Sequence, residues 1–217
     1  MVFIDKPSGI TSFDVVKTIR KKLRVKKAGH CGTLDPLATG LLVVLLGQST
    51  KLFSRFSEFD KAYEATLELG VSTTTGDCQG DVIDRRSIDG ISCKDIQHTL
   101  DVFKGDVIQV PPMFSALKYK GKKLYELARK GIEVPRKERN IKIYELNLNK
   151  FYLPYVDFSI HCSKGTYVRS LAQDIGAKLG CGACIVKIRR IGIGSFSIND
   201  AIKLDQVNES HIRNWPS

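Results

Sequence analysis

The chain has 217 residues, 42% of them hydrophobic, and its formal net charge is +11. This length suffices for one domain or two small ones with a sizeable core, and the charge favours a polyanionic partner, either nucleic acid or an anionic membrane surface. The longest apolar run, residues 41–46, is far too short to cross a membrane, and the N-terminus does not resemble a signal peptide. We therefore expect a cytoplasmic protein without a membrane anchor.

Hydrophobic periodicity and turn residues predict a mixture of strands and helices along the chain. In chain order they predict a strand at residues 2–4, a helix that Ser12 caps and that carries Phe13, Val16, Ile19 and Leu23, a buried strand at 41–46, a helical segment at 49–56 and a half-buried strand at 63–69. A loop at 73–89 follows, then a helix at 92–103, a strand at 113–119, a short basic helix at 124–130, strands at 141–143 and 156–162, a helix at 166–179 and a strand at 185–196. No regular βαβ spacing is present. The predicted fold class is therefore α+β, with a mixed, mostly antiparallel central sheet and flanking helices and loops.

Lysine and arginine gather in three segments. The first spans Lys17 to Lys27, the second spans Lys118 to Lys142, and the third consists of Lys187, Arg189 and Arg190. Each segment could be an ordinary solvated face, but three of them on so basic a chain favour contacts with nucleic-acid phosphates. The first two segments are the candidate surfaces.

Six cysteines are scattered along the chain, which indicates reduced thiols and not a disulfide framework. Cys181 and Cys184 have zinc-like spacing, but no second pair and no histidine lies at zinc-finger spacing from them. We therefore expect no bound metal. Whether this pair does more than pack stays open.

The segment Gly29–Gly40, GHCGTLDPLATG, places a single carboxylate, Asp35, in a glycine-broken loop. Pro36 biases Asp35 toward an extended conformation, and Gly29 and Gly32 permit turns that other residues resist. Such a loop can present one acid rigidly. The alternative is an aspartate that only starts a turn or caps a short helix beginning at Pro36.

This segment resembles the catalytic motif of the TruB-type tRNA pseudouridine synthases. Other blocks match the same family in order, namely DKPSGITS at 5–12, KAYE at 61–64, PPMFSALK at 111–118, GKKLYE at 121–126 and HCSKGTYVR at 161–169. The resemblance covers nearly the whole chain. It implies the pseudouridine synthase fold and the isomerisation of uridine 55 in the T loop of tRNA, without a cofactor. The target nucleotide must be flipped out of the folded loop.

The resemblance also implies the site residues. Asp35 acts at the ribose of the flipped uridine, Arg169 pairs with Asp35, and Tyr63 stacks on the base. The predicted contacts to RNA or substrate are His30, Lys6, Pro7, Lys164, Tyr167, Gly32 and Thr33. Without the resemblance, Arg169 would be read as a surface arginine and Tyr63 as a core aromatic.

We expect one catalytic domain over residues 1–217, without the additional C-terminal domain of the PUA type that many family members carry. The expected partner is the T stem-loop of tRNA, with no obligatory protein partner and a monomeric state. Three alternatives stay open. They are a non-catalytic RNA-binding or chaperone protein on this fold, a guide-dependent synthase resembling dyskerin, and a metal-dependent hydrolase, although the four histidines show no ligand spacing.

Overall fold

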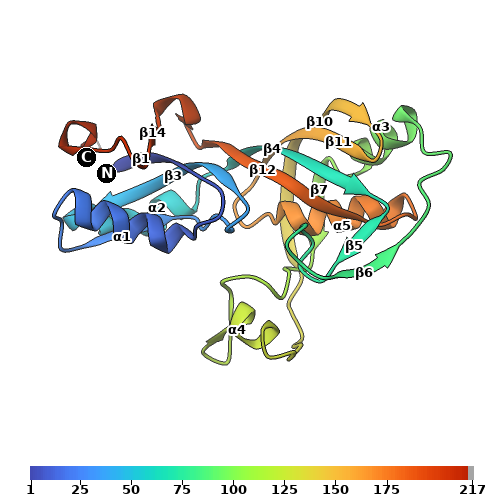
Figure 1. Cartoon of the computed structure of the whole chain (residues 1–217), viewed down its shortest axis with the longest axis horizontal. Helices are drawn as coiled ribbons and strands as arrows, with labels where there is room; N and C mark the ends of the chain where they lie inside the picture. Colours follow the sequence, from blue (N-terminus) through green and yellow to red (C-terminus); the bar gives the residue numbers. More distant parts are fainter. Residues whose placement is uncertain (215–217) are drawn as a thin grey trace. The chain divides into compact units, whose positions relative to one another are not determined.

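The computed structural model describes residues 1–214, so the last three residues of the predicted domain, 215–217, lie outside the described part (Figure 1). The chain divides into two compact units. The first consists of residues 1–64 and the chain from residue 188 onward, and the second consists of residues 65–187. Two strands, β4 (Lys61–Leu69) and β12 (Ala183–Ile193), contribute residues to both units. No helix within residues 1–214 is long and apolar enough to cross a membrane.

The first unit is built around β3, the most buried strand. Its elements are β1 (Val2–Lys6), α1 (Ser12–Lys22), β2 (Ala28–Cys31), β3 (Thr39–Leu46), η1 (Gly47–Leu52), α2 (Phe53–Ser57), β13 (Phe196–Ser197), η2 (Ile198–Asp200), β14 (Ile202–Lys203) and η3 (Glu209–His211). Strand β3 is antiparallel to β1 and β2 and pairs in parallel with the end of β12, while β14 pairs in parallel with β1.

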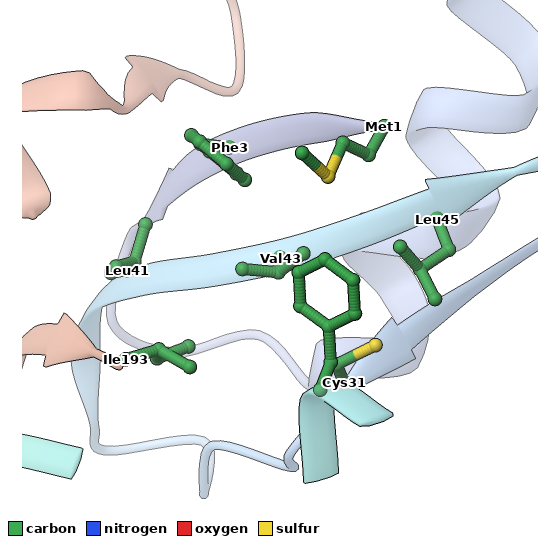
Figure 2. Close-up of a cluster of buried hydrophobic side chains, with 8 residues drawn as sticks. Met1, Phe3, Cys31, Leu41, Val43, Leu45 and Ile193 are labelled. Carbon is green, nitrogen blue, oxygen red and sulfur yellow. The ribbon is translucent and has the colours of Figure 1, made fainter. Parts of the chain in front are cut away.

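The apolar core of this unit follows from alternation along β1 and β3. Phe3, Leu41, Val43 and Leu45 share one face and pack with Phe56 of α2. Figure 2 shows this cluster, which Met1, Cys31 and Ile193 complete. Each fully buried side chain of this size contributes roughly 1.5–3 kcal/mol.

Helix α1 has its N-cap one residue earlier than the sequence predicts. Thr11, not Ser12, is the N-cap, and it forms a capping box with Asp14. The buried side of the helix carries Val15, Val16 and Ile19, whereas Phe13 is 59% exposed. The prediction that Phe13 belongs to the apolar face is therefore wrong.

The second unit combines a sheet with two longer helices. Its remaining elements are β5 (Val71–Thr73), β6 (Val82–Arg85), α3 (Cys93–Val102), β7 (Gly105–Gln109), β8 (Lys118–Tyr119), β9 (Lys122–Lys123), α4 (Leu124–Ala128), β10 (Arg139–Tyr152), β11 (Tyr155–Cys162) and α5 (Val168–Lys178). The strand order is β4-β11-β10-β7, with β10 antiparallel to both neighbours. Leu146 and Phe158 of the sheet and Leu171 of α5 are fully buried.

The predicted fold class is confirmed. The sheet is mixed: β1 with β3, β10 with β11 and β10 with β7 pair antiparallel, whereas β1 with β14 and β3 with β12 pair in parallel. Local predictions failed in two segments. Residues 73–89, predicted as loop, contain the last residue of β5 and all of β6, which pair with each other. Residues 113–119, predicted as a strand, are mostly irregular and form a strand only at β8. Strands β2 and β7 were not predicted.

Candidate active site

The loop with Asp35 joins β2 to β3 in the first unit and is held by backbone and side-chain bonds. Ser12 Oγ accepts a hydrogen bond from Leu34 N (2.8 Å) and donates to Leu34 O (3.0 Å). Gly9 N donates to Pro36 O at 2.8 Å, and Ala38 N donates to Asp35 O at 3.0 Å. Asp35 does start a turn, but no helix begins at Pro36. The loop is therefore fixed against the start of α1 while Asp35 itself stays half-buried.

Lys6 lies beneath this loop with no exposed surface. Its ammonium donates to the carbonyl oxygens of Pro7 (2.9 Å), Ile10 (2.7 Å) and Pro36 (3.3 Å). Burial lowers the pKa of Lys6 to about 8, against the carboxylate of Asp35, which raises it. Lys6 thus supports the loop and has no surface with which to contact RNA, whereas Pro7 and Thr33 are exposed and Gly32 is partly exposed.

His30, on β2, is partly exposed and precedes the same loop. Its Nδ1 is buried and has no hydrogen-bond partner among the described residues. Burial, and next the charge of Arg190, lower the pKa of His30, so the ring is neutral at pH 7. A neutral imidazole with a spare nitrogen suits stacking on a base or bonding to it.

The third basic segment is only partly solvated, because Lys187 is exposed but Arg190 is buried. Arg190 is only 1% exposed, and its guanidinium donates to Leu41 O (2.8 Å) and Gly32 O (3.0 Å). Arg189 forms a bidentate pair with Asp5 at 3.0 and 2.7 Å. The sequence did not predict Arg190 or Asp5 as residues of this site. A run of basic residues gives no sign that one of them is buried.

In the second unit, Arg169 occupies the first turn of α5 and is 5% exposed, so the reading of a surface arginine is wrong. It donates to Thr75 O (2.6 Å) and Phe114 O (2.7 Å), and its Nε lies 3.7 Å from Asp77 Oδ2. Asp77 is itself buried and accepts from Thr75 Oγ1 (2.7 Å) and Gln79 N (3.1 Å). A cavity of about 300 Å³ lies beside Thr75 and Phe114.

Tyr167 directly precedes α5 and is fixed through its backbone. The buried amide of Gln109 accepts from Tyr167 N (2.8 Å) and donates to Tyr167 O (3.1 Å). Lys164 is exposed in the turn before it. This turn, like the start of α5, belongs to the second unit, whereas the Asp35 loop and Tyr63 belong to the first. The pairing of Arg169 with Asp35 stays a prediction.

No group of three histidine, cysteine, aspartate or glutamate side chains within residues 1–214 could hold a metal ion. Cys181 and Cys184 are both buried, and burial raises the pKa of Cys184 to about 12. Its thiol is therefore protonated at neutral pH.

Two family models match the chain. The first, described as "TruB family pseudouridylate synthase (N terminal domain)", matches residues 20–168, and the second, "tRNA pseudouridylate synthase B C-terminal domain", matches residues 169–214. Among curated relatives, a protein of Clostridium tetani named tRNA pseudouridine synthase B is 48% identical to this chain, over 99% of this chain and 74% of the relative. The relative in Endomicrobium trichonymphae is 47% identical, over 97% of this chain and 91% of the relative.

Solved structures resemble the chain as well. A chain of a Cbf5-Nop10-Gar1 complex superposes with a TM-score of 0.74 at 32% identity, over 94% of this chain and 52% of that one. A chain of an H/ACA RNP bound to a substrate RNA containing 2′-deoxyuridine superposes with a TM-score of 0.70 at 28% identity, over 94% of this chain and 50% of that one. This chain thus spans about half the length of these solved chains.

Proposed function

Because the chain belongs to the TruB family of pseudouridylate synthases, we propose that it isomerises uridine 55 in the T loop of tRNA to pseudouridine. The reaction breaks the N1–C1′ bond of a uridine already in RNA, turns the base and joins C5 to C1′. It needs neither a redox change nor a group donor. The observation that carries the proposal is the loop of Asp35, a single carboxylate held by Ser12 and Lys6.

Asp35 acts at the ribose, either by attacking C1′ or by taking the 2′ proton to give a glycal-like intermediate. Both routes require the ionised carboxylate. The buried ammonium of Lys6 supplies positive charge close to it. Arg169 pairs with Asp35 in the proposed reaction, and the carbonyl oxygens of Thr75 and Phe114 already orient its guanidinium. Tyr63 stacks on the target base.

Extrusion of the uridine costs a few kcal/mol, which stacking and phosphate contacts must offset. The first basic segment suits this role, because its seven cations, Lys17, Arg20, Lys21, Lys22, Arg24, Lys26 and Lys27, are all exposed. Exposed lysines and arginines also line the segment 118–142. Such contacts position the RNA without reading its bases. The proposed setting is the cytoplasm, with the T stem-loop as the partner.

Tritium release from tRNA labelled at uridine C5 tests the proposal, comparing the wild type with Asp35→Asn. The control is Asp205→Asn, which removes an exposed carboxylate of the same unit. We expect release by the wild type and the control, mapped to the T loop, and none by Asp35→Asn, which still binds tRNA. A folded wild type that binds tRNA without release would overturn the proposal and favour a binding role.

The similarity to Cbf5 chains is the observation that favours a guide-dependent synthase as the second candidate. The two candidates differ in what they need. Release from free tRNA by the isolated chain supports the autonomous enzyme, whereas release only after addition of a guide RNA and partner proteins supports the second candidate.

A further inference from the structure

Arg190 is a buried cation whose charge no carboxylate neutralises. Its guanidinium donates only to two carbonyl oxygens, and within residues 1–214 no aspartate or glutamate lies at ion-pair distance from it. Removal of an arginine from water without an acidic partner costs free energy that two neutral acceptors do not recover in full. A core position that served only stability would favour an apolar side chain. A buried arginine at this position therefore indicates a functional role.

The two acceptors of Arg190 lie on either side of the Asp35 loop. Gly32 is the first residue after β2, and Leu41 belongs to β3, into which the loop leads. One side chain therefore ties both ends of the loop to β12, where Arg190 lies opposite Gly40 in the parallel register. A Cβ at Gly40 would lie 2.3 Å from Arg190 O, so glycine is required for this close approach.

The charge of Arg190 reaches the same loop. Burial is the main cause of the lowered pKa of Lys6 beneath the loop and of His30 before it, and the charge of Arg190 lowers both further. Asp35 is the single acidic residue of the segment 29–40, and its carboxylate is the negative charge that acts on Lys6. Two buried cations, Lys6 and Arg190, thus bond to the backbone of one loop that carries one carboxylate.

We infer that Arg190 is a positioning residue for Asp35, fixing the ends of the catalytic loop through Gly32 and Leu41 so that the carboxylate meets the ribose. This inference rests on the proposed function. The guanidinium acts through the loop and does not touch the RNA. Its planar fork reaches two carbonyl oxygens in different directions, which the single ammonium of a lysine cannot do in the same geometry.

The test compares Arg190→Gln and Arg190→Lys with the control Arg213→Gln, which removes a half-exposed arginine of the same unit paired with Asp200. Three quantities are measured for each variant, namely the melting temperature, the Kd for unmodified tRNA and the single-turnover rate of pseudouridine formation. We expect folded Arg190→Gln to bind tRNA within about twofold of the wild type and to react about 100-fold more slowly. Arg190→Lys recovers part of the rate, and Arg213→Gln keeps all of it.

A folded Arg190→Gln that reacts within about threefold of the wild type overturns the inference, and so does a rate loss matched by an equal loss of tRNA affinity. If Arg190→Gln does not fold, Arg190→Lys decides. A slower reaction at wild-type affinity and melting temperature supports the inference, and the full wild-type rate overturns it. A wild type that forms no pseudouridine contradicts the proposed function itself, whatever the variants do.

Discussion

The hydroxyl of Ser12 bonds to both backbone groups of Leu34, at 2.8 Å as acceptor and 3.0 Å as donor. Ser12 is the first residue of α1, and Leu34 directly precedes Asp35. All of these groups are buried, so water cannot replace either bond. These two bonds therefore hold the Asp35 loop against the start of α1.

Ser12→Ala leaves the N–H and carbonyl groups of Leu34 without partners in the interior. We expect the free energy of unfolding to fall by about 1–3 kcal/mol, with a slower single-turnover reaction. Urea denaturation measures the first quantity. Ser8→Ala is the control, because its hydroxyl bonds to Leu37 O of the same loop at an exposed position, and it should cost about 0.5 kcal/mol or less. Equal costs for both variants would contradict the expectation.

Gly40→Ala places a methyl group 2.3 Å from Arg190 O, at a φ of +100° that disfavours any other residue. We expect a loss of more than about 4 kcal/mol or failure to fold, read from the melting temperature and soluble yield. Gly29→Ala is the matched control, because nothing lies within 4 Å of its added Cβ and its φ is ordinary. A stable Gly40→Ala would show that β12 can move away from β3.

Asp77→Asn removes the carboxylate beside Arg169 Nε but keeps its shape. Because both side chains are buried, the loss leaves a guanidinium without that charge partner, and we expect stability to fall by about 1–3 kcal/mol together with the reaction rate. Denaturation and single-turnover assays measure both effects. Asp81→Asn, at an exposed position in the same segment, should change neither. A fully active Asp77→Asn would show that the ion pair of Asp77 with Arg169 has no role in the reaction.

The lowered pKa of Lys6 predicts that the free energy of unfolding rises in mildly alkaline solution. Its pKa falls from 10.5 in the unfolded chain to about 8 in the folded protein, so between these values the unfolded state binds more protons. The free energy of unfolding therefore increases as pH rises from about 8 to 10.5, by up to about 3 kcal/mol. Denaturation across this range, compared with Lys6→Met, isolates the effect. A stability difference between the two that does not depend on pH would refute it.

The exposed cations of α1 predict a salt-dependent contribution to tRNA binding. Arg20→Gln with Lys21→Gln should weaken binding and reduce the slope of log K against log salt concentration by about 1 for each phosphate that the variant no longer neutralises. Filter binding at several salt concentrations measures this slope. Lys51→Gln with Lys203→Gln removes two exposed lysines of the same unit as a control. Equal slopes for both double variants would exclude α1 from the interface.

Elements with strong periodicity were predictable. The apolar run of β3 and the recurrence of Leu171, Ala172 and Ile175 along α5 correspond to buried positions. The β5–β6 ribbon was not predictable, because Val82 and Ile83 are both largely exposed and give no alternation. Its order comes from backbone pairing, which composition does not show.

The Asp35 loop and Lys6 could be found from their sequence motifs, but the hydrogen-bond partners of Arg190 and Arg169 could not. Arg190 bonds to Leu41 across 149 residues of chain, and Arg169 meets Thr75 across 94. Local patterns report helix faces and turns, whereas these contacts depend on how distant strands pair. In a sequence, a basic residue that faces solvent cannot be distinguished from one that is buried beneath a loop.

Cys31 closes β2 directly before the Asp35 loop, is 1% exposed and has a pKa that burial raises to about 12. Its thiol can react with an alkylating reagent only when this part of the core opens, whereas Cys78 and Cys93 are exposed in the folded state. Cys162, Cys181 and Cys184 are buried as well, so the slow phase of labelling must be followed at Cys31 itself, where it measures the local opening equilibrium of the β2–β3 hairpin. Protection of that phase by bound RNA would report how much more rigid the hairpin becomes in the complex.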